Sequence, residues 1–393
     1  MKKAYTLLTV LLPILGVYAS PISWFDLGTF LVIIFAGFCL FDKRAIIKIS
    51  PFLGVLLVYT IFTTVLNFIL PDSTKYSADF SIIMRMARFV VMLVVMLGIG
   101  YATYFDFELT IKYLRRVTLV VGVYSILQLL FFYATGLKLI NVFGPTKQGI
   151  VFDSMLGEYE TTYRPPSLFL EPSSVAYYVM PYLCYALFHK HTDSKDKKQS
   201  YTYAAIISVG VLCTTSGQGV VCVFALWTIW LLHYLITNRV QKGLIVLIVF
   251  IIVAPIVLSN ERVTFALERI FVVDENVMDA VDARYQGYDA FKQLTTLFKI
   301  IGTGYGNYSE EIYYSSFADI LFCTGIIGCI LVLLLYANIF KKGVPYQKAL
   351  VVVTLLLMAG GGVYTATLLC FYLPLLFSNK ESEKLKTLQM VMI

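Results

Sequence analysis

Charged residues are scarce in this chain of 393 residues, of which 14% are charged and 59% are hydrophobic. A soluble domain carries roughly a quarter charged residues, so the composition excludes an ordinary soluble globular protein. Histidine is rarer still, with only His189, His191 and His233. All seven cysteines fall inside apolar stretches, which indicates neither a disulfide framework nor a thiolate metal site. We therefore expect no metal ion and no cofactor.

The chain consists mainly of long apolar stretches that are separated by short charged connectors. Stretches of this length predict transmembrane helices. The expected fold is an all-α integral membrane protein, a single polytopic domain over residues 1–393 with about twelve spans. The predicted spans are 4–20, 23–41, 51–70, 81–104, 117–135, 173–189, 201–215, 219–236, 244–259, 317–340, 348–361 and 363–378.

Lys and Arg gather in alternate connectors, such as 42–48 and 189–198, which the positive-inside rule places in the cytoplasm. Both termini are then cytoplasmic, in a multi-pass protein of the cytoplasmic (inner) membrane. The net charge of +7 comes mostly from these connectors and does not indicate nucleic acid. The first segment also fits a signal peptide, whose removal would leave the later orientation unchanged. The extracytoplasmic connectors are 71–80, 136–172, 216–218, 260–316 and a turn near 361.

Two extracytoplasmic connectors, 136–172 and 260–316, are much longer than joining two helices requires. Structureless loops of that length are uncommon unless they are functional. Within the second, Tyr285, Tyr288, Phe291, Leu294 and Phe298 recur at steps of three and four. This spacing predicts an amphipathic helix over 283–302, which is either a surface anchor or a functional lid.

Arg85 and Arg88 stand three residues apart inside a predicted span, near its outer end. Arginine at membrane depth usually faces the bundle interior and has a partner. The alternative is that both side chains snorkel to the outer headgroups. We treat Arg85 and Arg88 as candidate substrate-binding residues.

The stretch "TTYRPPSLFLEPSSVAYY" (161–178) places Arg164 and Glu171 just before an apolar helix. Pro165 and Pro166 disfavour helix at Arg164 and predict an extended entry. Pro172 is suited to the first helical turn, which puts Glu171 beside the N-cap. Glu171 is then either a helix-capping residue, favoured by the helix dipole, or an active-site carboxylate.

Arg284 opens the predicted amphipathic helix, and Gly302, Gly304 and Gly306 follow it in "GTGYGNY". The glycines form either a flexible turn or a backbone that approaches a ligand phosphate or sugar. Several arginines and a carboxylate at an outer membrane face suit the transfer of a sugar from a lipid diphosphate. Arginine binds phosphate through two hydrogen bonds, fixed cations stabilise a departing diphosphate, and a carboxylate can act as general base.

Three motifs resemble the Wzy-type O-antigen and capsular polysaccharide polymerases, within the O-antigen polymerase/ligase superfamily. They are "RPPSLFLEPSSVA" (164–176), "TTSGQGVV" (214–221), and "ARYQGYDAF" followed by "IIGTGYGNY". Their order and the topology resemble the family over nearly the whole chain. Other members often carry arginine in the Ser/Gly turn; Gln218 stands there in this chain, so this position is assigned no phosphate contact.

The resemblance implies a GT-C-like bundle and a metal-independent glycosyltransferase. It would move a growing glycan from undecaprenyl diphosphate to a lipid-linked oligosaccharide repeat unit, for O-antigen or capsule. Its partners would be that lipid-linked oligosaccharide, the lipid bilayer, a chain-length regulator and a flippase. Arg164 and Arg284 become the main candidates for contacting diphosphate or glycan, and Glu171 a candidate base or positioning residue.

Three other functions remain open on the sequence. An O-antigen ligase, as the resemblance presents that branch, relies on a histidine in the large outer loop, and no predicted outer connector contains histidine. A lipid-oligosaccharide flippase usually keeps carboxylates in mid-membrane, whereas Asp26 and Asp319 lie near span ends. A cell-wall polymerase of the shape and elongation class shares the hydropathy profile but lacks the three motifs.

Overall fold

The structure is a computed structural model that describes residues 1–22, 24–70, 76–143, 145–146, 163–190, 194–237, 264, 278–309 and 311–378. Its named elements in those ranges are all helices. In chain order they are α1 (Lys2–Leu15), α2 (Leu27–Phe41), α3 (Pro51–Ile69), α4 (Asp79–Leu93), the π-helix η1 (Val94–Tyr101), α5 (Ala102–Tyr104), α6 (Phe107–Thr135), α7 (Pro172–Phe188), α8 (Ser194–Cys213), α9 (Gly217–Thr237), α12 (Met278–Gln293), α13 (Thr296–Ile301), α14 (Ser316–Lys342), α15 (Pro345–Gly360) and α16 (Ala366–Phe377).

Each predicted span that falls within the described residues corresponds to a helix, whereas the predicted span 244–259 lies outside them. Among the described helices, 5 are long and apolar enough to cross a membrane. This confirms an all-α membrane protein, while the total of twelve spans stays a prediction. The five cover Pro51–Ile69, Asp79–Tyr104, Phe107–Thr135, Gly217–Ile236 and Ser316–Lys342.

Two helices, α6 and α8, begin well before the start that the hydropathy pattern predicts. α6 starts at Phe107 instead of residue 117, because Asp106 caps it by accepting a hydrogen bond from the Leu109 N–H at 3.0 Å. The charged connector 111–116 is therefore helical. α8 likewise starts at Ser194 instead of residue 201, since Lys and Gln favour helix even where they are too polar for a membrane.

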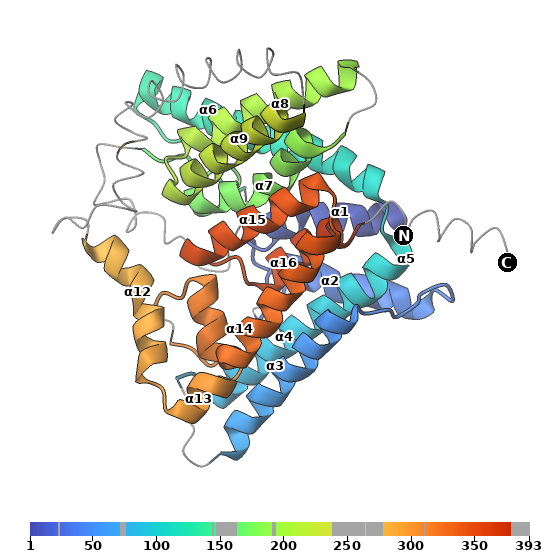
Figure 1. Cartoon of the computed structure of the whole chain (residues 1–393), viewed down its shortest axis with the longest axis vertical. Helices are drawn as coiled ribbons and strands as arrows, with labels where there is room; N and C mark the ends of the chain where they lie inside the picture. The colour runs from blue at the N-terminus through green and yellow to red at the C-terminus, as the bar shows by residue number, and fades with distance from the viewer. Residues whose placement is uncertain are drawn as a thin grey trace.

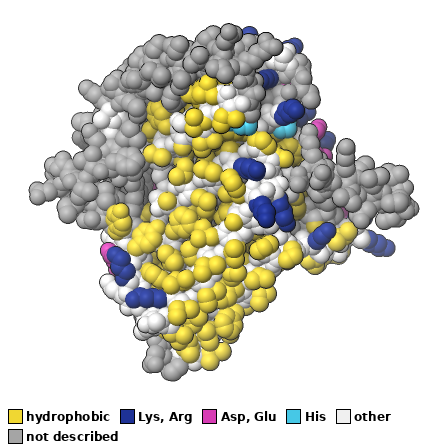
Figure 2. All heavy atoms as spheres, viewed as in Figure 1, with side chains coloured by type: hydrophobic (Ala, Val, Ile, Leu, Met, Phe, Trp, Pro, Cys, Tyr) yellow, Lys and Arg dark blue, Asp and Glu magenta, His cyan; other side chains and the backbone are white. Residues whose placement is uncertain are grey.

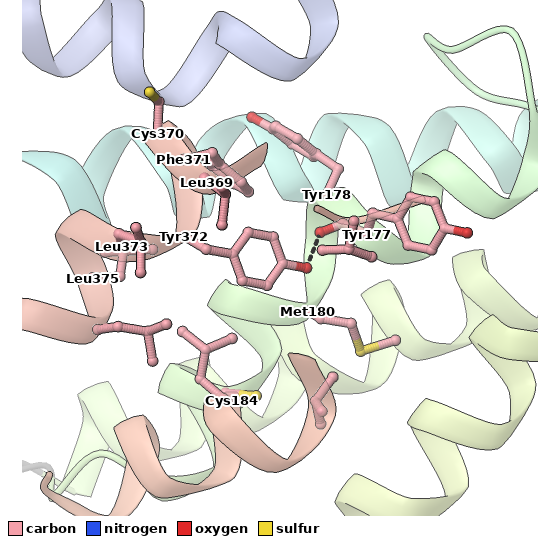
Figure 3. Close-up of a cluster of buried hydrophobic side chains, with 14 of the residues drawn as sticks. Tyr177, Tyr178, Met180, Cys184, Leu369, Cys370, Phe371, Tyr372, Leu373 and Leu375 are labelled. Carbon is pink, nitrogen blue, oxygen red and sulfur yellow. Dashed lines mark hydrogen bonds between the residues drawn. The ribbon is translucent and has the colours of Figure 1, made fainter. Parts of the chain in front are cut away.

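α7 lies at the centre of the bundle, and most of its side chains are buried. Figure 3 shows its packing against α16, where the Tyr372 hydroxyl donates a hydrogen bond to the Tyr177 carbonyl. The Tyr178 ring stacks on Phe371 with centroids 5.2 Å apart. On the other side of the bundle, α6 and α8 touch at glycines, since a Cβ at Gly210 would meet the Gly122 carbonyl oxygen at 2.5 Å. Small residues allow such close helix contacts in membranes.

Different helices lie at opposite sides of the bundle (Figure 1). In Figure 1 the N terminus and α5 lie on the right, and α12 and α13 lie on the left. Figure 2 shows a broad hydrophobic face. Among the described helices, α3 has the exposed apolar residues Val55, Val58, Phe62 and Ile69. An exposed apolar face of this kind suits contact with lipid chains.

Candidate active site

The segment that carries Arg164 is held against α6 by Gln128. The Ser167 N–H donates to Gln128 Oε1 at 2.8 Å, and Gln128 Nε2 donates to the Ser167 carbonyl at 3.2 Å. The Ser167 hydroxyl also donates to the Val121 carbonyl at 2.8 Å. Gln128 and Ser167 are fully buried, and Ser167 has a positive φ of 54°. Both prolines of the segment are buried as well, so the backbone around Arg164 is fixed outside any helix.

Arg164 joins this segment to the turn between α8 and α9. Its Nε donates a hydrogen bond to Thr215 Oγ1 at 3.2 Å. Thr215 is buried and has a positive φ of 48°, a conformation that a β-branched residue rarely adopts. The structure thus brings "RPPS" and "TTSGQG" together, although they are far apart in the sequence.

Gln218, in the first turn of α9, connects three helices. The Tyr177 hydroxyl donates to Gln218 Oε1 at 2.7 Å, and Gln218 Nε2 donates to the Leu357 carbonyl at 3.2 Å. The side chain thereby ties α7, α9 and α15 at one end. A side chain engaged at both polar atoms fits the assignment of no phosphate contact to this position.

Glu171 is the N-cap residue of α7, and Pro172 occupies the first turn as expected. Its side chain makes no capping hydrogen bond to the backbone. Instead Glu171 Oε2 accepts a hydrogen bond from the Ser173 hydroxyl at 3.1 Å, and the side chain is exposed. The position matches the helix-cap interpretation, although the exposed carboxylate does not itself cap the helix.

Arg88 forms an ion pair with Asp26, the N-cap residue of α2. Asp26 is 2% exposed and also accepts the Thr29 N–H at 2.8 Å. Arg88 therefore has the kind of partner that is expected of an arginine within a membrane-spanning helix. Its Nε atom is buried without a hydrogen-bond partner.

Arg85 contacts the glycine-rich turn. One guanidinium nitrogen donates to the Gly306 carbonyl at 2.9 Å and to the Ser77 hydroxyl at 3.1 Å. The guanidinium also lies over the Tyr308 ring, 4.6 Å from its centroid. Arg85 and Arg88 thus contact different partners despite their spacing on one helix.

The three glycines of "GTGYGNY" have positive φ angles of 88°, 94° and 85° at Gly302, Gly304 and Gly306. Added Cβ atoms would meet the Cys323 carbonyl oxygen at 2.4 Å, Thr64 Cα at 2.9 Å and Arg85 Cβ at 2.7 Å. The turn is thus wedged between α3, α4 and α14, where α14 is itself kinked at Gly325. These three positions need glycine because of their positive φ angles and their close contacts with neighbouring segments of the chain.

The predicted amphipathic helix over 283–302 is wrong in one respect, because the chain forms α12 and α13 with a break at Leu294 and Thr295. Leu294 and Phe298 pack in a small buried cluster with Phe322 of α14, whereas Tyr285 is 57% exposed. Arg284 lies in α12, but its side chain is outside the described residues.

Comparison with known protein families shows which family this chain belongs to. Residues 7–275, more than half of the chain, match the family described as WcaD colanic acid polymerase. The chain belongs to this family. No curated protein and no solved structure gives a significant match. Family membership confirms the resemblance to Wzy-type polymerases and indicates a glycosyltransferase-type enzyme that polymerises polysaccharide repeat units.

The matched region of the WcaD family contains Arg85, Arg88, Arg164 and Glu171, while Arg284 and the three glycines lie beyond it. The sequence did not reveal that Gln128 holds the Arg164 segment or that Asp26 pairs with Arg88. An Asp directly before an apolar run is a helix N-cap signal that could have assigned the cap of α2. No local pattern connects it to an arginine on α4.

Proposed function

We propose that this member of the WcaD family transfers a growing glycan from undecaprenyl diphosphate to the terminal sugar of a lipid-linked oligosaccharide repeat unit. The reaction takes place at the outer face of the cytoplasmic membrane. The single observation that carries the proposal is the position of Arg164, fixed on a rigid segment where two of the family-like motifs meet.

The outer location is supported by hydrogen bonds among the connectors predicted to lie outside. Arg164 contacts Thr215, which directly precedes the predicted connector 216–218, and Ser316 Oγ donates to the Gly361 carbonyl at 2.6 Å. The Tyr76 N–H donates to Asn307 Oδ1 at 2.8 Å, which joins connector 71–80 to connector 260–316. Connectors that share a membrane face can touch in this way, so the contacts agree with the alternation of charge along the chain.

Arg164 and Arg284 would hold the diphosphate of the donor. As the bond to the sugar breaks, the leaving diphosphate gains negative charge, and guanidinium groups fixed beforehand stabilise it without reorganisation. Arg85 and Arg88 are secondary substrate-binding candidates, because each has a partner within the protein. The backbone of Gly302, Gly304 and Gly306 would line the same region, and Glu171 would act as base or positioning residue for the glycan.

Purified protein incubated with its own repeat unit linked to undecaprenyl diphosphate tests the proposal. We expect a ladder of two, three and more repeats on a gel, with and without EDTA, since arginines replace the metal ion. A parallel reaction with the repeat unit on undecaprenyl monophosphate should give no ladder. A single unchanged band with the diphosphate substrate, from folded protein, would contradict the proposal, and transfer to lipid A core instead would identify a ligase.

A further inference from the structure

A cavity of about 310 Å³ lies between the start of α6, the last turns of α7 and the start of α8. Ile111, Tyr182 and Ser200, one from each helix, are buried residues of its lining. Arg164 precedes the first residue of α7, whereas Tyr182 lies near its end. Because α7 has 17 residues, its two ends are about 25 Å apart. The cavity is therefore separate from the candidate active site.

Charged side chains of both signs line this cavity. Lys112 and Arg115 supply cations from α6, and Glu108 and Asp196 supply carboxylates from the first turns of α6 and α8. Within the part of the chain that the structure describes, no ion pair joins these cations to these carboxylates. The Arg115 guanidinium instead lies over the Tyr203 ring, 5.8 Å from its centroid. Both kinds of charge are thus available to a ligand.

The buried part of the cavity contains a polar group that is not satisfied by the protein. Tyr182 is 1% exposed, and its hydroxyl has no hydrogen-bond partner among the described residues. A buried hydroxyl in this state costs free energy. One wall is formed by His189, whose ring stacks on Tyr185 with centroids 4.4 Å apart. A ligand oxygen in the cavity that accepted the Tyr182 O–H would remove the cost.

The ends of the helices explain only part of this arrangement. The helix dipole favours Glu108 and Asp196 in first turns. Lys112 and Arg115 belong to the predicted cytoplasmic connector 111–116, where the positive-inside rule expects them. Neither effect requires a cavity that all four residues line, and neither accounts for a buried hydroxyl without a partner.

We propose that this cavity binds a phosphate joined to a primary ammonium, which is the chemistry of a phosphoethanolamine head group. The phosphate accepts hydrogen bonds from Lys112, Arg115 and the Tyr182 hydroxyl. The ammonium donates to Glu108 and Asp196. A ligand with phosphate alone would face two unpaired carboxylates, and a simple amine would face two unpaired cations. A ligand that carries both charges is therefore the best match to the lining.

Two sources can supply this group. The predicted topology places this end of α6 and α7 at the cytoplasmic face, where phospholipids present their head groups beside the ends of the spans. A soluble phosphoethanolamine ester of the cytoplasm carries the same phosphate and ammonium. The inference does not depend on glycan transfer, because the cavity and the Arg164 segment lie at opposite ends of α7.

Binding of short-chain phosphatidylethanolamine to the purified full-length protein in non-ionic detergent tests the proposal, with native mass spectrometry as the measurement. We expect saturable binding of a single lipid. Phosphatidylglycerol with the same acyl chains lacks the ammonium and should bind on the order of tenfold more weakly. Glycerophosphoethanolamine, which has no acyl chains, separates the sources. Weaker binding than the lipid identifies a membrane ligand, and equal binding identifies a soluble one.

Variants of the lining decide whether binding occurs in this cavity. Arg115→Ala should weaken binding about tenfold, whereas Arg116→Ala, an exposed neighbour that does not line the cavity, should not. Glu108→Gln combined with Asp196→Asn should weaken the binding of phosphatidylethanolamine but not that of phosphatidylglycerol. Tyr182→Phe should weaken binding without lowering the Tm of the lipid-free protein, because the hydroxyl has no partner to lose.

Three results would overturn the proposal. The first is no saturable binding of either phosphatidylethanolamine or glycerophosphoethanolamine. The second is binding that Arg115→Ala and Tyr182→Phe leave unchanged, and the third is phosphatidylglycerol binding as tightly as phosphatidylethanolamine. If Arg115→Ala fails to fold, Tyr182→Phe and the double carboxylate variant decide the matter.

Discussion

Arg164 and Arg88 are two candidate arginines that the protein holds in different ways. Arg164 stands on a non-helical segment fastened by the buried amide of Gln128, and it donates to a threonine hydroxyl. Arg88 stands within a helix, and the nearly buried Asp26 balances its charge. A guanidinium already paired with a carboxylate has less positive charge to offer a diphosphate. The ion pair therefore leads us to expect that Arg88 contributes mainly to stability, while the role of Arg164 in the reaction is our proposal.

Arg88→Ala should have the largest effect on stability. It leaves the buried Asp26 carboxylate without its ion pair, a loss worth about 3–5 kcal/mol when both partners are buried. Because 28% of the Arg88 side chain is exposed, we expect a smaller loss, about 2–3 kcal/mol, measured as a lower Tm in detergent. The double variant Asp26→Asn with Arg88→Gln should recover most of it, since asparagine also caps a helix. A Tm for Arg88→Ala equal to that of the wild type would remove the structural role.

Gln128→Ala should have a smaller effect on stability and a distinct effect on activity. It leaves the buried N–H and carbonyl of Ser167 without partners, at a cost of about 1–3 kcal/mol. The Arg164 segment then shifts, and a misplacement of about 1 Å can lower a rate about 100-fold. The initial rate of polymerisation should therefore fall more than the Tm suggests. Gln199→Ala, which removes an exposed amide bonded to Tyr203, serves as the control. Equal rates of polymerisation for the two variants would contradict the role of Gln128 in holding the Arg164 segment.

Hydropathy was sufficient to place the helices, because each span is a local property of the chain. It could not place their ends, as shown by α6, whose start depends on the Asp106 cap instead of on apolar residues. The break between α12 and α13 was missed because the spacing of Tyr285 to Phe298 is helical throughout.

The candidate residues were found by their unusual positions, but their partners were not predictable. Asp26 and Arg88 are 62 positions apart, and Gln128 and Ser167 are 39 apart. Such pairs depend on how helices are arranged in space, which one sequence does not specify. The glycines of the 302–306 turn were recognised, but the contact of Gly302 with α14, next to the kink at Gly325, was not predictable.

The most direct test of the account is the initial rate of polymerisation by purified Arg164→Ala and Arg164→Lys. We expect Arg164→Ala to lose about 100-fold to 1,000-fold, as removal of one donor to a developing charge does elsewhere, with an unchanged Tm. Arg164→Lys should fall between, because it keeps the charge but loses the two-pronged geometry. Arg116→Ala, at an exposed position of α6, is the control. A rate for Arg164→Ala within about threefold of the wild type would contradict the central role of Arg164.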